Sequence, residues 1–262
     1  MKISNKILLN GFTGLVMITG MSTALIGCNG ASSSSTEDQN SNVVLEHEVT
    51  PTDTTTAVVS DQTDTQIIDD NQLDANEQTH LMFMREEEKL ARDVYLKLGE
   101  MYPDSPIFGN IDDSEQQHTT AVKEMIEKYG LEDPNTNDNV GAYTGAEYGW
   151  YFTEKFDQLV TRGSISELEA LYVGAFIEEL DMMDINQCPK VIVEADNGIN
   201  DVTECGKIYT DNEDITQLYN SLLDGSDSHL AGYVKNIEKR TGEGSYVAQV
   251  LPQSQVDAYL GR

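Results

Sequence analysis

Two of the four histidines in the chain, His118 and His229, occupy the middle of separate amphipathic segments. His118 completes a Glu-x-x-His motif that begins at Glu115, and this spacing places a carboxylate and an imidazole on one helical face. Glu88 and Glu178 hold comparable positions in two other amphipathic segments. Helical bundles build carboxylate metal sites from Glu and His side chains that four helices point inward. The pattern therefore predicts that these five residues bind metal.

The segment around His229 departs from this pattern at one position. Serine stands at Ser226, where a second Glu-x-x-His motif would have its glutamate. The predicted centre is therefore one carboxylate short of a symmetric pair of motifs. Asp181 lies three residues after Glu178 on the same helical face, and it is the candidate substitute for the missing oxygen ligand.

Several buried carboxylates in one place need compensation, because a buried charge is costly unless it is paired. One interpretation is a structural salt-bridge network, in which Arg92 is the nearby basic partner. We favour a divalent metal, which neutralises several carboxylates at once. Mixed carboxylate and imidazole ligands suit iron, with manganese or zinc as alternatives, better than calcium, which takes oxygen ligands. Glu87 and Glu179 stay open as alternatives, because each lies next to a predicted ligand.

Apolar residues at three- and four-residue steps predict the helices that must position these side chains. Four long helices are expected, over about residues 73–101, 111–129, 165–185 and 212–240. Pro103 and Pro106 should separate the first from the second, and Ser164 or Ser166 should cap the third. A short helix is expected over residues 153–161. Together these elements predict an all-α fold, a four-helix bundle with long connections.

The connections carry weaker signals than the helices. Residues 186–211 hold two cysteines and a Val-Ile-Val run at 191–193, for which a small hairpin is the expected structure. Residues 242–262 are expected to form an extended tail packed over the bundle. The sequence has no Gly-rich phosphate loop and no Gly-x-Ser-x-Gly elbow. Nucleotide-binding and serine-hydrolase functions therefore lack their usual motifs.

The N-terminus has the features of an export signal. Lys2 and Lys6 precede an apolar run over residues 7–26, which ends shortly before Cys28. This arrangement resembles a bacterial lipoprotein signal, in which residues 1–27 are removed and Cys28 receives the lipid. An uncleaved membrane anchor is the alternative, and the weakly apolar composition of the run disfavours it. We expect a protein of the cell envelope, attached by lipid to the periplasmic or extracellular face of a membrane.

Composition divides the remainder into a tether and one folded domain. Residues 28–76 are rich in small polar and acidic side chains, which predicts a disordered tether. Residues 77–262 are expected to form one helical domain. With Cys28 lipidated, Cys188 and Cys205 remain, and such a pair in an exported protein predicts a disulfide. The formal net charge of −30 argues against nucleic acid as a partner and is compatible with attracting metal cations.

Four segments of the expected domain, taken together, resemble the family catalogued as domain of unknown function 2202 (DUF2202), a ferritin-like group. The segments are residues 85–95, 114–118, 174–181 and 222–230. The resemblance covers roughly residues 77–262 and implies a ferritin-like bundle. It implies that the ligands along the four long helices are, in order, Glu88, Glu115 with His118, Glu178 and His229. Ser226 departs from the di-iron pattern of ferritins and rubrerythrins, where a glutamate would stand.

Two hypotheses of different class follow from these observations. The first is a lipid-anchored, ferritin-like metal-binding protein with iron-dependent redox chemistry, either ferrous iron oxidation or peroxide reduction. The second is a non-enzymatic surface lipoprotein, whose bundle is a structural or interaction module with one structural metal or none. Ser226 bears on the choice because it removes one carboxylate from the set that holds two metals. The oligomeric state stays open.

Overall fold

The computed structural model describes residues 72–262, and all regular secondary structure in this range is helical. The helices are α1 (Ala75–Met101), α2 (Pro106–Lys128), α3 (Gly149–Gly163), α4 (Glu167–Asn186), α5 (Lys190–Val193), α6 (Glu213–Thr241) and α7 (Gln253–Tyr259). The predicted all-α fold class is therefore confirmed for this part of the chain. The expected signal peptide, Cys28 and the tether up to residue 71 lie outside the described residues. From residue 72 onward, no helix combines the length and the apolar composition that a bilayer-spanning segment needs.

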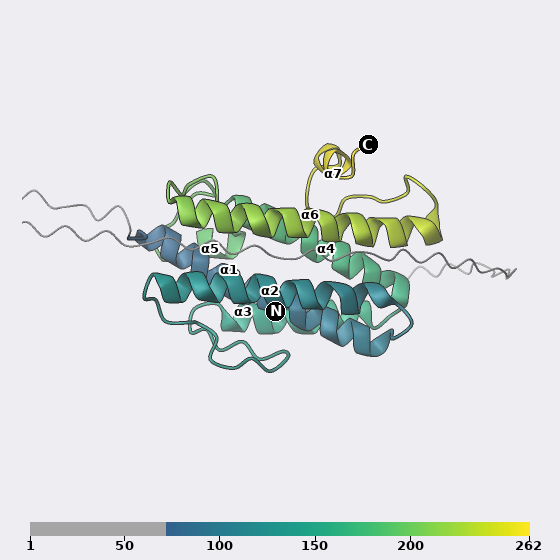
Figure 1. Cartoon of the computed structure of the whole chain (residues 1–262), viewed down its shortest axis with the longest axis horizontal. Coiled ribbons are helices and arrows are strands. Elements are labelled where there is room, and N and C mark those ends of the chain that lie inside the picture. The colour runs from purple at the N-terminus through teal and green to yellow at the C-terminus, as the bar shows by residue number, and fades with distance from the viewer. Residues whose placement is uncertain (1–71) are drawn as a thin grey trace, which may run out of the picture. The chain divides into compact units, whose positions relative to one another are not determined.

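The four long helices, α1, α2, α4 and α6, form the helical bundle that carries the predicted ligands (Figure 1). α1 packs mainly against α2, and α4 packs mainly against α6. Contacts of α2 with α6 and of α1 with α4 join these two pairs, and α3 covers α1 and α4. The shared interior is largely apolar, since Leu81, Val94, Leu171 and Ile237 are fully buried. Burial of each such side chain stabilises the fold by about 1.5–3 kcal/mol.

Capping side chains explain where three of the long helices begin. Asp74 accepts hydrogen bonds from the first turn of α1 and forms a capping box with Glu77. Ser166 caps α4, because its hydroxyl accepts a backbone N–H of the first turn. Asn212 does the same for α6 through its side-chain oxygen. Ser166, and not Ser164, is therefore the cap of the third long helix.

The start of α2 corrects the sequence prediction. The helix begins at Pro106, five residues earlier than the apolar pattern indicates. Proline is well tolerated in the first turn of a helix, where its missing N–H would have no partner in any case. Pro106 therefore opens α2, and the additional turn brings Ile107 and Phe108 into the core.

The connections and the tail differ from the prediction in three places. Residues 191–193 lie in the single turn of α5, so the expected hairpin is wrong; Pro189 restricts the backbone at the entrance of this turn. The short helix expected over 153–161 is longer at both ends, as α3 shows. The tail is not extended throughout, because it contains α7. Cys188 and Cys205 form a disulfide, as predicted, with their Cα atoms 4.8 Å apart.

A buried carboxylate on α4 holds the C-terminal segment against the bundle. Glu179 is fully buried and receives hydrogen bonds from one hydroxyl and three backbone N–H groups. The donors are the Tyr246 hydroxyl and the backbone of Gln249, Val250 and Leu251. The carboxylate of Glu179 is thus committed to the tail.

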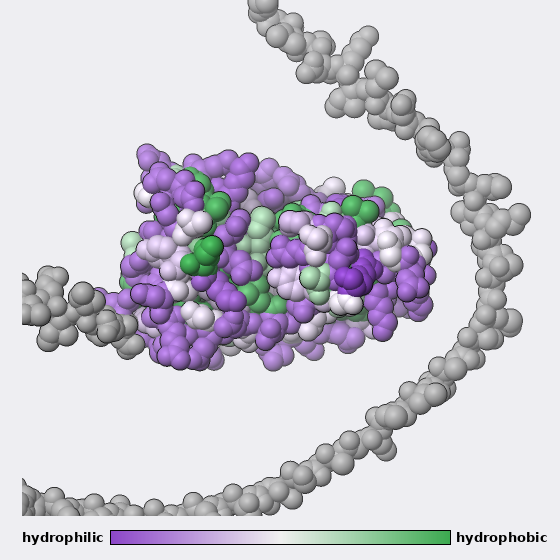
Figure 2. All heavy atoms as spheres, turned by 90° about the horizontal axis from the view of Figure 1, so that it is seen from above, coloured by the Kyte–Doolittle hydropathy of each residue, from purple (hydrophilic) through white to green (hydrophobic). Residues whose placement is uncertain are grey.

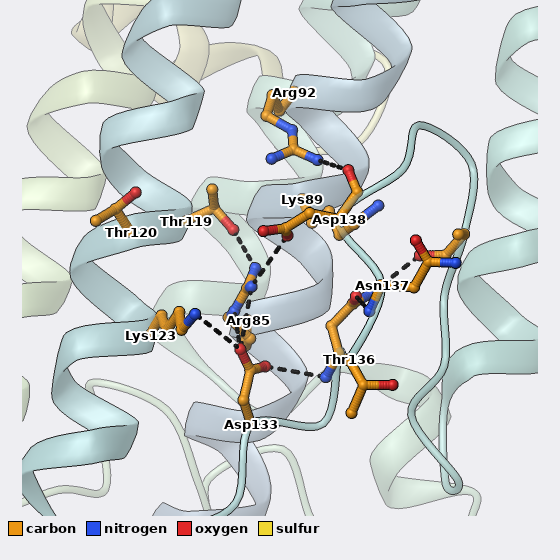
Figure 3. Close-up of polar contacts among 12 residues, drawn as sticks. Arg85, Lys89, Arg92, Thr119, Thr120, Lys123, Asp133, Thr136, Asn137 and Asp138 are labelled. Carbon is orange, nitrogen blue, oxygen red and sulfur yellow. Dashed lines mark hydrogen bonds and ion pairs between the residues drawn. The ribbon is translucent and has the colours of Figure 1, made fainter.

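Basic side chains of α1 hold the long connection between α2 and α3 (Figure 3). Arg85 Nη2 lies 3.2 Å from Asp133 Oδ2 and 3.5 Å from Asp138 Oδ1. Arg92 donates to Asp93 Oδ1 at 2.8 Å and to the Asp138 carbonyl at 3.1 Å. Arg92 is therefore engaged away from the predicted ligands, and the interpretation that pairs it with them is wrong.

Candidate metal centre

The five predicted ligands come together at the centre of the bundle. Two groups of three residues have one ligand atom each within 4.8 Å of one another. The first group is Glu88, Glu115 and His118, and the second is Glu115, Glu178 and His229. Glu115 belongs to both groups. We refer to them below as the α2 half and the α6 half, after the helix that supplies the histidine.

The distances place Glu115 between the two imidazoles. Its Oε2 lies 3.0 Å from His118 Nδ1, and its Oε1 lies 2.7 Å from His229 Nδ1. Glu88 Oε2 completes the α2 half at 3.3 Å from His118 Nδ1. Glu178 Oε2 completes the α6 half at 3.6 Å from His229 Nδ1. Each half therefore has two carboxylates and one imidazole nitrogen around a common point.

Several polar atoms in this region have no hydrogen-bond partner among the described residues. They are Glu88 Oε1, Asp181 Oδ1 and His229 Nδ1, and all of them are buried. The nitrogen of His229 lies close to two carboxylates without hydrogen-bond geometry to either. Buried polar groups are almost always paired, and an unpaired one costs about 1–3 kcal/mol. Unpaired polar atoms beside converging carboxylates and imidazoles fit a metal ion, which would compensate them.

Protonated imidazoles are the alternative source of compensation. Burial alone would raise the pKa of Glu115, but its hydrogen bond with His118 and the close approach of the His229 ring lower it to about 2. Burial opposes the charge on His118, yet Glu115 and Glu88 raise its pKa to about 12. The same opposition holds for His229, whose pKa rises to about 10 beside Glu115 and Glu178. Without metal, the two rings carry protons on the atoms that would bind it, so protons and metal compete for them.

The other two carboxylates remain poorly compensated. Burial raises the pKa of Glu88 to about 7, although His118 partly offsets the effect. Burial also raises the pKa of Glu178, and the nearby His229 ring and the hydrogen bond from Tyr95 oppose the change. Both carboxylates are about as buried as Glu115, with exposed fractions of 1–2%. A divalent cation would stabilise their charged forms at neutral pH.

Asp181 stands beside the centre and belongs to neither half. Its Oδ2 accepts a hydrogen bond from Ser226 Oγ at 2.5 Å, while its Oδ1 has no partner. Burial, followed by the charge of Glu88, raises its pKa well above the usual value. The serine at the position of the missing glutamate thus holds the aspartate that was predicted to replace it.

The alternatives left open by adjacent glutamates are separated by their partners. Glu88 faces His118, whereas Glu87 interacts with Asp184, and burial raises the pKa of Glu87 well above its usual value. Glu178 faces His229, whereas Glu179 binds the C-terminal segment. The structure therefore brings Glu88 and Glu178 to the histidines.

Side chains around the centre fix some of the predicted ligands. The Tyr95 hydroxyl donates to Glu178 Oε1 at 2.5 Å. His229 Nε2 lies 3.0 Å from Ser114 Oγ. Such outer partners orient ligands and set the reactive ring nitrogen. Sequence reasoning missed Ser114, although it lies four residues before His118 and hence on the same face of α2.

Comparisons with known proteins agree on one family. The family described as an uncharacterized protein domain, DUF2202, matches residues 77–205 and 191–261. The uncharacterized protein MJ0754 of Methanocaldococcus jannaschii is 40% identical over 184 residues, which are 70% of this chain and 86% of that protein. A crystal structure of hypothetical protein MJ0754 from Methanococcus jannaschii matches with a TM-score of 0.60 and 36% identity, over 72% of this chain and 94% of that one. The matched residues include all five predicted ligands that converge at the centre, and the chain belongs to the DUF2202 family.

Proposed function

We propose that the domain is a ferritin-like protein that binds two divalent metal ions, iron in preference to manganese or zinc. The observation that carries the proposal is the position of Glu115, whose two oxygens each approach the histidine of a different half. A carboxylate shared in this way serves two metals in carboxylate-bridged centres. The order of ligands along the chain, with Glu-x-x-His on the second long helix, supports the ferritin-like assignment.

The residues present would hold the metals as follows. Glu88 and His118 would bind one ion and Glu178 and His229 the other, with Glu115 between them. Asp181 would be an additional oxygen ligand, oriented by Ser226. Two imidazoles among carboxylates suit iron, manganese or zinc.

The chemistry that we propose is redox: iron, when bound, would supply a centre at which ferrous iron is oxidised to ferric iron while peroxide or oxygen accepts the electrons and is reduced. The protein contributes burial, ligand geometry and control of protons. His118 and His229 must each release the Nδ1 proton before that atom can bind metal. The Tyr95 hydroxyl keeps Glu178 in position through its hydrogen bond.

We also propose that the protein is attached to a membrane of the cell envelope through lipid on Cys28. Support comes from the sequence around this cysteine, which lies outside the described residues. Replacing Cys28 with alanine should abolish the covalent incorporation of labelled fatty acid that the native chain shows in the cell. A native chain that incorporates no fatty acid would contradict the anchor and leave the metal proposal unaffected.

Metal analysis tests the main proposal directly. The full chain, loaded anaerobically with ferrous iron and freed of excess metal, should retain two equivalents, and peroxide should change its absorption. Glu115→Ala/His118→Ala should lose metal. Gln117→Ala, on the exposed face of α2, is the matched control and should retain it. Absence of bound iron and manganese in the native chain would reject the proposal.

A structural role is the second candidate, and one observation favours it. The protonated forms of His118 and His229 compensate Glu115 without any metal. In that case the centre is a buried ion-pair network that stabilises a surface module. Thermal unfolding with and without added iron or manganese separates the two functions. A metal-binding centre should gain thermal stability from the added metal, and a purely structural network should gain none.

A further inference from the structure

The ring of His118 lies directly against the backbone of α6 at Gly225. A Cβ atom at residue 225 would lie 2.3 Å from His118 Cε1 and 2.4 Å from Nε2. Nonbonded carbon and nitrogen atoms do not approach so closely, since their optimal separations are about 3.5–4.0 Å. Glycine is unfavourable inside a helix, and a close approach of another group explains its presence here. Gly225 thus makes the observed position of the His118 ring possible.

The ring of His229 is held in the reciprocal way. It extends from α6, and its Nε2 lies 3.0 Å from the hydroxyl of Ser114 on α2. Its Nδ1 points to the shared carboxylate of Glu115. A partner on Nε2 leaves Nδ1 as the nitrogen available to a metal.

Each imidazole is therefore positioned by the helix that carries the other one. The two ring centroids are 5.6 Å apart, and the ring planes are inclined by 30°. These rings are also the most exposed ligands of the centre, at 12% for His118 and 10% for His229. The carboxylates behind them are almost fully buried. At the interface between α2 and α6, the positions of the two imidazoles thus depend on two small residues, Gly225 and Ser114.

We infer that Gly225 and Ser114 are positioning residues, each dedicated to one half of the metal centre. Gly225 acts through shape on the α2 half, and Ser114 acts through a hydrogen bond on the α6 half. The inference rests on the proposed function, because it assigns these residues to the same two metal sites. Its consequence is that the two halves can be impaired separately, without altering a ligand.

The two residues should differ in how severely their loss acts. In Gly225→Ala the new Cβ overlaps the ring, so His118 must leave its position and the α2 half should lose its metal. In Ser114→Ala the ring of His229 keeps its space and loses one hydrogen bond. Loss of such an outer partner typically weakens metal binding about 10- to 100-fold.

A matched control lies seven residues further along α6, on the same face. A Cβ atom at Gly232 would meet Ile107 Cδ1 at 3.6 Å, which is an ordinary contact. Alanine favours the helix over glycine at both positions, so α6 should fold in both variants. Gly225→Ala should therefore displace the His118 ring, whereas Gly232→Ala should leave it in place.

Titration of the full-length protein with manganese(II), followed by the electron paramagnetic resonance signal of the free ion, tests the inference. We expect two equivalents for the native chain and for Gly232→Ala, and one for Gly225→Ala. Ser114→Ala should bind two equivalents, one of them about 10- to 100-fold more weakly. Two tight equivalents in Gly225→Ala, or the loss of both, would overturn the assignment of Gly225 to one half.

A second measurement separates this inference from the proposed function. If the native chain binds no manganese and no iron, the proposed function fails. Nitrogen-15 spectra of the imidazoles in the metal-free protein still test whether Gly225 positions the His118 ring. Gly225→Ala should shift the His118 ring resonances, and Gly232→Ala should not. Unchanged His118 resonances in Gly225→Ala would overturn the inference.

Discussion

Helix α1 buries charged groups on two sides, and the two sides are compensated differently. Toward the α2–α3 connection, Lys89 and Asp93 form an ion pair at 2.5 Å with both side chains fully buried. Arg92, the Gly141 N–H and the Tyr143 hydroxyl supply the remaining donors to this aspartate. Toward the bundle centre, Glu88 meets one imidazole and keeps an unpartnered oxygen.

The comparison shows two uses of buried charge in one helix. The first network contains permanent cations, and its buried side-chain atoms have hydrogen-bond partners within residues 72–262. A complete network of this kind holds one conformation and has no place for an added ion. The network at the bundle centre depends on the histidines His118 and His229, which can exchange a proton for a metal. Incomplete pairing around exchangeable groups is what distinguishes the candidate metal centre from the structural network.

The largest expected effect comes from breaking the complete network. Asp93→Ala removes the carboxylate and leaves Lys89 charged and buried, so the free energy of unfolding should fall by about 3–5 kcal/mol. The loss should be the same with manganese and with a chelator, because the candidate metal centre lies on the other side of α1. Urea denaturation in both conditions measures it.

Lys97→Ala is the control on the same helix. Its pair with Glu100 is exposed, so the free energy of unfolding should change by at most about 1 kcal/mol. An Asp93→Ala chain that is as stable as the native one would contradict the structural role of this network.

The second prediction breaks the incomplete network. Glu88→Gln removes a carboxylate whose pKa burial raises to about 7. The metal-free chain should therefore keep its stability at neutral pH or gain some. Metal affinity should fall by more than the roughly 10- to 100-fold that loss of an outer partner costs. Calorimetric titration with manganese measures the metal affinity, and urea denaturation measures the stability of the metal-free chain. A large loss of metal-free stability in Glu88→Gln would contradict the prediction.

The convergence of the five predicted ligands could be foreseen from the sequence because each of them lies on a helical face defined by local spacing. The Glu-x-x-His spacing of Glu115 and His118 can be recognised within one helix, without knowing how the other helices pack. The contacts of Asp93 could not be predicted in the same way, since Gly141 and Tyr143 lie in a connection without periodicity. Ser114 was missed for a related reason, because its bond to His229 depends on how closely α2 approaches α6.

The start of α2 shows a different limit. Proline both ends one helix and opens the next, and local patterns do not say which of the two occurs. The Val-Ile-Val run at 191–193 is similar, because β-branched residues form a strand only where another strand can pair with them. In both places the outcome depends on packing against distant parts of the chain.

The third prediction concerns the pH dependence of the network at the bundle centre, which contains His229. Burial opposes the charge on His229, but Glu115 and Glu178 raise its pKa from 6.5 to about 10 in the metal-free chain. A raised histidine pKa gives stability that is fully present below pH 6.5 and is lost as the pH rises toward 10. Metal binding displaces the same proton, so metal affinity should increase over that window.

Urea denaturation of the chelated protein and manganese titration, each between about pH 6.5 and pH 9, measure the two trends. We expect metal-free stability to decrease and manganese affinity to increase. His229→Gln should lose most of the first trend. Metal-free stability that rises across this range in the native chain would contradict a protonated His229.

The smallest expected effect concerns the outer partner of the α6 half. Tyr95→Phe removes the hydrogen bond to Glu178 Oε1 and leaves the ring in place. One of two manganese equivalents should weaken by about tenfold, which corresponds to about 1.4 kcal/mol. The α2 half should be unaffected, and equal weakening of both equivalents would contradict the division into halves.

The anchoring of the C-terminal segment has a consequence for the order of events during synthesis. Glu179 lies next to the predicted ligand Glu178, and its donors come from Tyr246 and the residues around Val250. Until these residues have been synthesised, the Glu179 carboxylate lacks the donors that it has in the folded chain. The final hydrogen bonding of this part of α4 is therefore completed only when residues 246–251 are available, near the end of synthesis.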